Sequence, residues 1–105
     1  MRDRLLLSIV VLLVSAGCGG GVDEADERTA VAAAKAAYAD AKAAGTDLTD
    51  GPCLGRVLPD WVADVAHDPR TDVDDDPANQ CADYRSGEVD HFVELDPDGE
   101  VIRVE

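Results

Sequence analysis

The apolar residues of this chain change their pattern along its length. They fill positions 5 to 14 except for Ser8 and then recur in shorter groups separated by polar residues. Residues 23–44 are rich in alanine, the best helix former, and contain no glycine or proline. We therefore predict a helix here, with Asp23 as N-cap and Gly45 just past its end. Its buried face should comprise the residues that share one arc of that helix: Ala30, Val31, Ala34, Ala37, Tyr38 and Ala41.

The second half of the chain has the composition of strands and turns. Residues 61–66 predict a strand, and residues 89–95 and 100–104 flank a Pro-Asp-Gly turn that is typical of a β-hairpin. The apolar patch at 54–58 predicts one helical turn, and Pro77 should begin a short second helix that ends at Gly87. We expect an α+β fold in which both helices pack on a small antiparallel sheet, made of one strand plus the C-terminal hairpin.

The apolar stretch at 5–14 has the length of a signal-peptide core and is too short to span a membrane. Arg2 and Arg4 precede it, and small residues at 15–17 lead to Cys18. This segment resembles the bacterial lipobox. The resemblance implies cleavage before Cys18, acylation of its thiol with chains such as palmitate, and a lipid-anchored, extracytoplasmic domain in the cell envelope. The alternative is an ordinary secretory signal that Cys18 follows by chance.

These segments divide the chain into three parts. We expect a signal peptide at 1–17, the lipidated cysteine and a glycine tether at 18–22, and one small domain at 23–105. The whole chain has a formal net charge of −14, and removing the signal, with its net charge of +1, makes the remainder about −15. Such a surface repels nucleic acid, so the expected partners are the membrane, through the lipid, and a protein.

Cysteine chemistry follows from the same resemblance. The chain has three cysteines, and acylation of Cys18 leaves Cys53 and Cys81 as a pair in an oxidising compartment. We predict a disulfide between them. Metal ligation by the pair is disfavoured because neither cysteine belongs to a CxxC motif or has a histidine pair nearby.

Two groups of residues are candidate metal sites. Asp72, Asp74 and Asp76 alternate as the first ligands of an EF-hand calcium loop do, and residues 72–83 would be that loop. Pro77, however, occupies the position where such a loop needs a glycine with positive φ. The competing hypothesis is a solvated acidic loop in which Asp76 caps the second helix.

The second candidate group is His67 and His91, which could approach each other if their strands pair, with Asp64, Asp68 or Asp90 as further ligands. No motif of a serine hydrolase, zinc protease or nucleotide-binding loop occurs in the sequence. We therefore expect no catalysis and no cofactor.

Several stretches between residues 51 and 96 resemble small, uncharacterised secreted or lipid-anchored bacterial domains. These stretches are Gly-Pro-Cys-Leu-Gly at 51–55, Pro-Asp-Trp-Val at 59–62, Ala-His-Asp-Pro-Arg at 66–70, Asn-Gln-Cys at 79–81 and His-Phe-Val-Glu-Leu-Asp at 91–96. The resemblance implies a compact module with a disulfide and no particular activity. We expect a non-catalytic binding module at the membrane surface; the alternative is a calcium-binding lipoprotein that uses the acidic loop.

Overall fold

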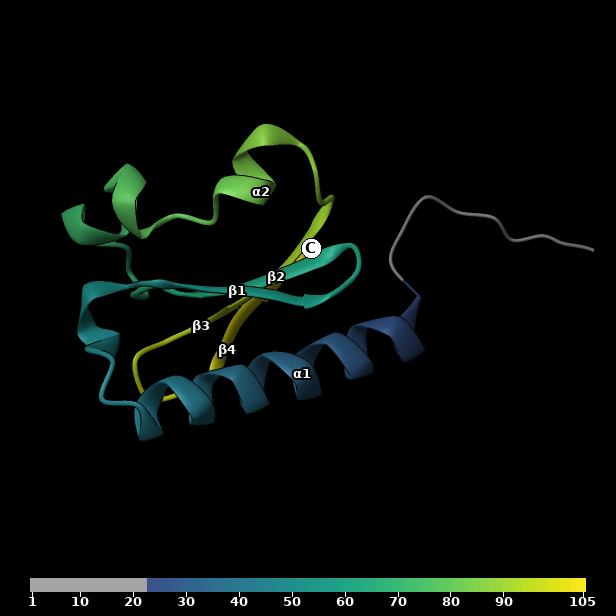
Figure 1. Cartoon of the computed structure of the whole chain (residues 1–105), viewed down its shortest axis with the longest axis horizontal. Helices are drawn as coiled ribbons and strands as arrows, with labels where there is room; N and C mark the ends of the chain where they lie inside the picture. The colour runs from purple at the N-terminus through teal and green to yellow at the C-terminus, as the bar shows by residue number, and fades with distance from the viewer. Residues whose placement is uncertain (1–22) are drawn as a thin grey trace, which may run out of the picture.

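The computed structural model describes residues 23–105 as one α+β unit (Figure 1). Its elements, in chain order, are α1 (Glu24–Ala43), η2 (Leu48–Asp50), β1 (Cys53–Leu58), β2 (Trp61–Val65), η3 (Asp72–Asp75), η4 (Pro77–Asn79), α2 (Ala82–Ser86), β3 (His91–Leu95) and β4 (Val101–Val104). The elements labelled η are 3₁₀ helices of three or four residues.

The four strands form one mixed sheet in the order β1-β2-β3-β4. The two outer pairs are antiparallel, whereas the central strands β2 and β3 run parallel. A parallel pair needs a crossover connection, and residues 66–90 provide it over one face of the sheet. Helix α1 covers the other face (Figure 1). The α+β class is thus confirmed, and the fully antiparallel sheet was wrong.

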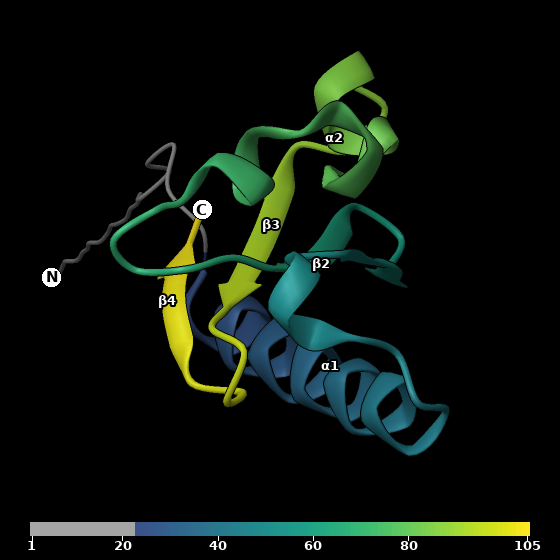
Figure 2. The same ribbon diagram turned by 90° about the vertical axis from the view of Figure 1, so that its left-hand side faces the viewer.

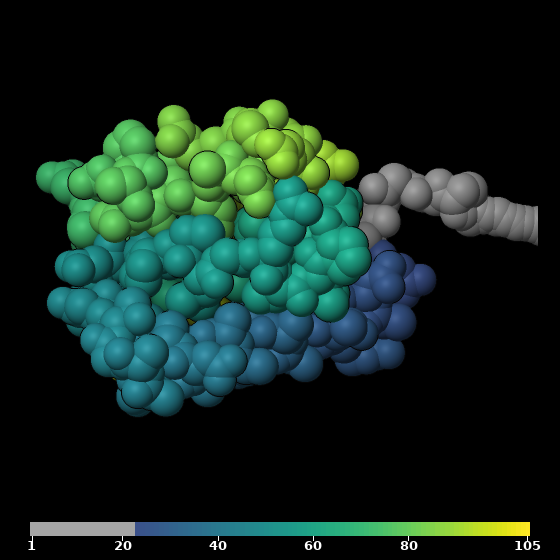
Figure 3. Space-filling view, in the orientation of Figure 1, coloured from purple at the N-terminus to yellow at the C-terminus, as the bar shows by residue number. Residues whose placement is uncertain are grey.

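Strand β1 is the element that the sequence analysis assigned to the wrong class. The apolar patch at 54–58 pairs with β2 instead of forming a helical turn. A patch of five residues fits either structure by itself, and the neighbouring strand decides between them. Figure 2 shows how β4, β3 and β2 lie side by side above α1, and Figure 3 shows α1 and the crossover on opposite sides of the molecule.

Helix α1 follows its prediction closely. The Asp23 carboxylate accepts a hydrogen bond from the Ala25 amide, and Gly45 lies beyond the helix end with φ +85°. The predicted arc faces the sheet, where Ala30 and Ala34 are fully buried. Alanine side chains let the helix lie close to the strands. The central cluster comprises these two alanines together with Trp61, Ala63, Val93 and Leu95.

The C-terminal hairpin is also confirmed, and α1 holds its turn. The Tyr38 hydroxyl donates a hydrogen bond of 2.7 Å to the Pro97 carbonyl oxygen. Gly99 has φ +90°, and a Cβ atom there would lie 2.9 Å from the Tyr38 ring. Glycine at this position therefore serves both the turn and the close approach of the helix.

The second helix is shorter than predicted. Asp76 caps as expected, because its carboxylate accepts from the Ala78 amide, but the first turn is the separate 3₁₀ helix η4. Gln80 is extended, and α2 proper ends at Gly87, which has φ +85°. The break lies directly before Cys81, which forms the predicted disulfide with Cys53. This bridge joins the crossover to the first strand.

The signal peptide, the tether and the proposed lipidation site Cys18 lie outside the described residues. Within residues 23–105, no helix combines the length and apolar character needed to cross a membrane.

Candidate functional site

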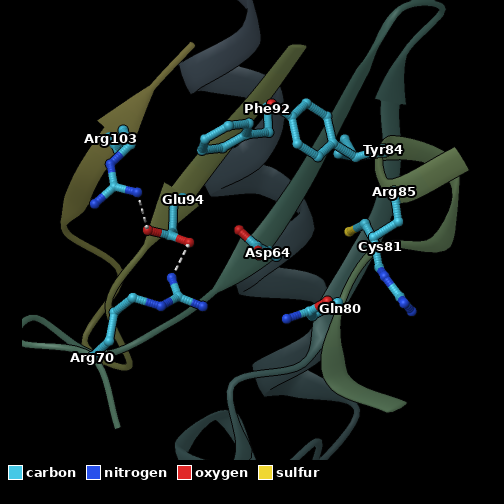
Figure 4. A pocket seen from close by; sticks show the side chains of 10 residues that line it. Asp64, Arg70, Gln80, Cys81, Tyr84, Arg85, Phe92, Glu94 and Arg103 are labelled. Atoms are coloured by element: carbon cyan, nitrogen blue, oxygen red, sulfur yellow. Dashed lines mark hydrogen bonds and ion pairs between the residues drawn. The ribbon is translucent and has the colours of Figure 1, made fainter. Parts of the chain in front are cut away.

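A pocket of about 250 Å³ lies on the sheet face opposite α1, between the strands and the crossover (Figure 4). Side chains from the three strands β2, β3 and β4 form its floor, and side chains from the crossover and α2 form its walls. The floor residues are Val62, Asp64, Phe92, Glu94 and Arg103.

Strand register explains why charged groups gather on this floor. Asp64 is the register partner of Cys53 on one side and of Glu94 on the other, and Glu94 is paired with Arg103. Register partners present their side chains on the same face of a sheet. A row of one cysteine, two acids and one arginine therefore crosses all four strands. It places the carboxyl groups of Asp64 and Glu94 beside each other on the two central strands.

Glu94 is compensated by two guanidinium groups although it is almost completely buried. Arg70 Nη1 lies 3.2 Å from Glu94 Oε2, and Arg103 Nη1 lies 3.7 Å from Glu94 Oε1 (Figure 4). Arg70 also donates to the Asp74 carbonyl oxygen and to the Asp75 carboxylate. It thereby fixes the crossover loop against the floor of the pocket.

Asp64 has no comparable compensation. Among residues 23–105, no hydrogen bond or ion pair reaches its carboxyl group, and its Oδ1 atom is buried. Burial raises the pKa of Asp64 to about 7, and the negative charge of Glu94 adds to the increase. The carboxyl group therefore changes its charge near neutral pH, at the centre of a cavity.

The walls of the pocket combine an aromatic pair with polar groups. The rings of Tyr84 and Phe92 meet edge to face, with centroids 4.9 Å apart. Gln80 donates from Nε2 to the Asp74 carbonyl oxygen at 3.4 Å. Cys81 is held by its disulfide, and Arg85 is exposed at the rim. The arrangement suits a small organic ligand that is apolar on one side and polar on the other.

A second cluster of titratable groups surrounds Asp74, whose side chain is fully buried. Its Oδ1 lies 2.9 Å from His67 Nδ1, and its Oδ2 accepts from the backbone amides of Thr71 and His67. Although burial raises the pKa of Asp74, these hydrogen bonds outweigh burial and hold it below its ordinary value. The cluster closes the start of the crossover into a tight loop, so the expectation of a solvated Asp74 was wrong.

The structure does not bring the predicted metal candidates together. Asp72 is exposed, Asp74 is buried against His67, and Asp76 caps η4. Within the described part of the chain, no group of three or more His, Cys, Asp or Glu side chains is placed to hold one metal ion.

The two histidines lie at opposite ends of the sheet. His91 pairs in register with Trp61 at the start of β2, whereas His67 follows the end of β2. Parallel pairing therefore separates them by about 20 Å of extended chain. His91 stacks on Trp61 with ring centroids 4.7 Å apart, and its Nε2 lies 3.6 Å from the Asp60 carboxylate.

Substitution of Asp74 tests its role in the loop. Asp74→Asn can keep the oxygen that accepts from the amides of His67 and Thr71, but it removes the negative charge and replaces the oxygen that faces His67 Nδ1 with an NH₂ group. We expect a loss of about 1–3 kcal/mol in the free energy of unfolding, measured by urea denaturation with Trp61 fluorescence. The exposed neighbour provides the control, because Asp72→Asn should change stability by less than about 0.5 kcal/mol. Equal effects of the two substitutions would contradict the assigned role.

Sequence reasoning named Asp64 only as an accessory to the histidines and missed Glu94, Arg70, Arg103 and Gln80. A signal was present, since Asp64 and Glu94 each lie between apolar residues of a strand. A charged residue within such a strand is unusual and requires a partner or a function. The two acids are neighbours only because β2 and β3 pair in parallel. This pairing cannot be deduced from the sequence of either strand alone.

Comparison with known proteins gives no further guide. No protein-family model, curated protein or solved structure matches this chain.

Proposed function

We propose that this protein is a non-catalytic binding module, anchored by lipid on the outer side of a cell membrane, and that the pocket over Asp64 and Glu94 is its binding site. One observation carries the second part of the proposal. The half-buried carboxyl group of Asp64 and the buried one of Glu94 lie side by side in a cavity, and each has a buried oxygen atom to which no residue in 23–105 donates a hydrogen bond. Buried polar atoms normally have partners, and a bound ligand would supply them.

Binding is favoured over catalysis by the state of Glu94. A pair of carboxyl groups can act as acid and nucleophile in glycoside cleavage. Here both oxygen atoms of Glu94 face guanidinium groups, at 3.2 and 3.7 Å, which makes the carboxylate a weak nucleophile. The same ion pairs hold the floor of the pocket in one arrangement, as a binding site requires.

The proposed location rests on the lipobox resemblance and is supported by the disulfide, which is typical of oxidising compartments. The acidic net charge, −14 for the whole chain, agrees with a partner other than nucleic acid. The calcium alternative has no corresponding support, because the acidic side chains at 72–76 point to different partners.

The anchor is tested at Cys18. Because its thiol is the proposed acylation site, Cys18→Ser should move the protein from the membrane fraction to the supernatant after carbonate extraction, with no change in unfolding midpoint. A protein with two acyl chains stays firmly on the membrane, whereas a protein with one chain binds only transiently. Retention of the serine variant in the membrane fraction would contradict lipid anchoring at this residue.

The binding site is tested by photo-crosslinking in intact cells. A benzoylphenylalanine residue at position 85 lies at the rim of the pocket, and one at position 35 lies on the exposed side of α1. We expect a discrete crosslinked product from position 85 that Asp64→Asn removes, and none from position 35. Identical products from both positions would reject the pocket as the binding site.

A further inference from the structure

The centre of the pocket has two carboxyl oxygen atoms to which no residue in 23–105 donates a hydrogen bond. Arg70 and Arg103 both contact Glu94, whereas among residues 23–105 no cationic group lies within 4 Å of Asp64. Oδ1 of Asp64 and Oε1 of Glu94 are both buried without a hydrogen-bond donor. Figure 4 shows the two carboxyl groups near each other on the floor, with Gln80 opposite. A cationic donor placed between them would satisfy both oxygen atoms.

We propose that the pocket binds a primary ammonium group on a short alkyl stem, as in a lysine side chain or a free alkylamine. This inference rests on the pocket being the binding site. An ammonium group has three N–H donors. Two can be accepted by the free oxygens of Asp64 and Glu94. The third can be accepted by the amide oxygen of Gln80, whose nitrogen is already bound to Asp74.

The remaining walls fit the stem of such a ligand. The rings of Tyr84 and Phe92 offer an apolar surface for methylene groups, and aromatic rings also attract an ammonium ion. The cavity of about 250 Å³ is smaller than the pockets that take drug-sized ligands, which begin at about 300 Å³. Its size therefore matches the end of one side chain or a small amine.

Other charged ligands fit the site less well. A divalent cation needs several oxygen ligands, and within residues 23–105 no group of three or more His, Cys, Asp or Glu side chains is placed to hold one. A planar guanidinium binds best to both oxygens of one carboxylate, and such a contact with Asp64 would leave Glu94 Oε1 without a donor. An anion would meet Asp64 at the centre of the floor. The excess of 23 acidic over 9 basic residues also attracts cations to the chain as a whole.

The test uses the full chain in detergent micelles, titrated with n-butylammonium chloride and followed by amide chemical shifts in NMR spectra. A blocked Gly-Lys-Gly peptide in a parallel titration distinguishes the two sources of the ammonium group. If the peptide binds more tightly than n-butylammonium, the site takes a lysine side chain. If n-butylammonium binds as tightly as the peptide or more tightly, the site takes a small amine. Both results support the proposal. We expect the largest shifts at Asp64, Glu94 and Gln80.

The pH dependence gives a second readout. Ionised Asp64 binds the cation, and its carboxyl group titrates near pH 7, so affinity should be about tenfold weaker at pH 6 than at pH 8. An alkylammonium group stays charged over this range. The titratable and charged groups that face Asp64 from the surrounding elements are Glu94, Arg103, Arg70, Asp74, Tyr84 and Arg85.

Matched variants complete the design. Asp64→Asn should weaken binding at least about tenfold at pH 8, equal to the loss of one charge-assisted hydrogen bond. Asp40→Asn removes the same charge from an exposed position on α1 and should change affinity less than about twofold, as expected for a screened surface charge. Unchanged near-ultraviolet circular dichroism would show that both variants are folded.

Three results would overturn the proposal: no saturable shifts with n-butylammonium, equal affinity in the Asp64→Asn variant, or tighter binding of calcium chloride or n-butylguanidinium. The crosslinking experiment separates this failure from failure of the proposed function. If the product at position 85 persists and depends on Asp64, the pocket remains a binding site and only its ammonium ligand is rejected. If both experiments fail, both proposals are rejected.

Discussion

Asp64→Asn should make the protein more stable at pH 8 by about 4 kcal/mol and change its stability little at pH 4. The folded protein keeps this carboxyl group protonated up to pH about 7, mainly because of burial and then because of Glu94. In the unfolded chain it ionises near pH 4. Between these values the unfolded state has fewer protons, so the free energy of unfolding falls as pH rises. Asparagine does not ionise, so the variant does not lose stability in this way as the pH rises.

The measurement is a series of urea denaturation curves between pH 4 and pH 8 for the original chain and the variant. The difference between them should grow up to pH about 7 and then remain constant. Asp74 has the opposite dependence, because its lowered pKa gives stability that is lost in acid. Both proteins share that loss, so the difference isolates Asp64. The control Asp40→Asn should show a flat difference; a flat difference for Asp64→Asn would contradict the assignment of a buried, uncompensated acid.

This destabilisation also bears on the proposed function. A carboxyl group that lies in a cavity and lowers the free energy of unfolding at neutral pH is typical of a binding site, where residues that bind a ligand often destabilise the free protein. A ligand that pairs with ionised Asp64 should restore part of what its burial costs. Ligand binding and folding are linked here through one carboxyl group.

Local sequence patterns predicted the local structure of this protein. The alanine arc of α1, its caps, the turn at residues 96–99 and the stop at Gly87 each depend on residues close in sequence, and each is confirmed. The disulfide was predicted from the number of cysteines and the compartment. These features require no knowledge of which strands are neighbours.

The pairing of distant segments was not predictable in the same way. An apolar patch of five residues became β1 because β2 was available beside it, and the crossover made the central pair parallel. Both errors extend to the site. Parallel pairing separates His67 from His91, which seemed the natural pair, and joins Asp64 to Glu94. The buried position of Asp74 has the same origin, since its partners are amides of a loop whose path depends on the crossover.

Removing the disulfide should have the second large effect. Replacement of both cysteines, Cys53→Ala with Cys81→Ala, should lower the free energy of unfolding by about 3–4 kcal/mol, as loop-closure entropy predicts for this separation of 28 residues. A domain of this size has a small core and depends on such a bridge. The bridge also holds the wall of the pocket, because Cys81 lines the pocket and belongs to the same segment as two other lining residues, Gln80 and Tyr84.

Urea denaturation of the double variant and of the original chain, with and without dithiothreitol, measures this contribution. Reduction of the original chain should bring its stability to that of the double variant, whereas the reductant should not affect the variant. Amine binding should weaken in parallel, since a loosened segment 80–84 no longer holds Gln80 and Tyr84 against the floor. If the double variant keeps both its stability and its affinity, the bridge does not stabilise the fold, and the pocket wall is held by the Arg70 and Asp74 contacts of the crossover alone.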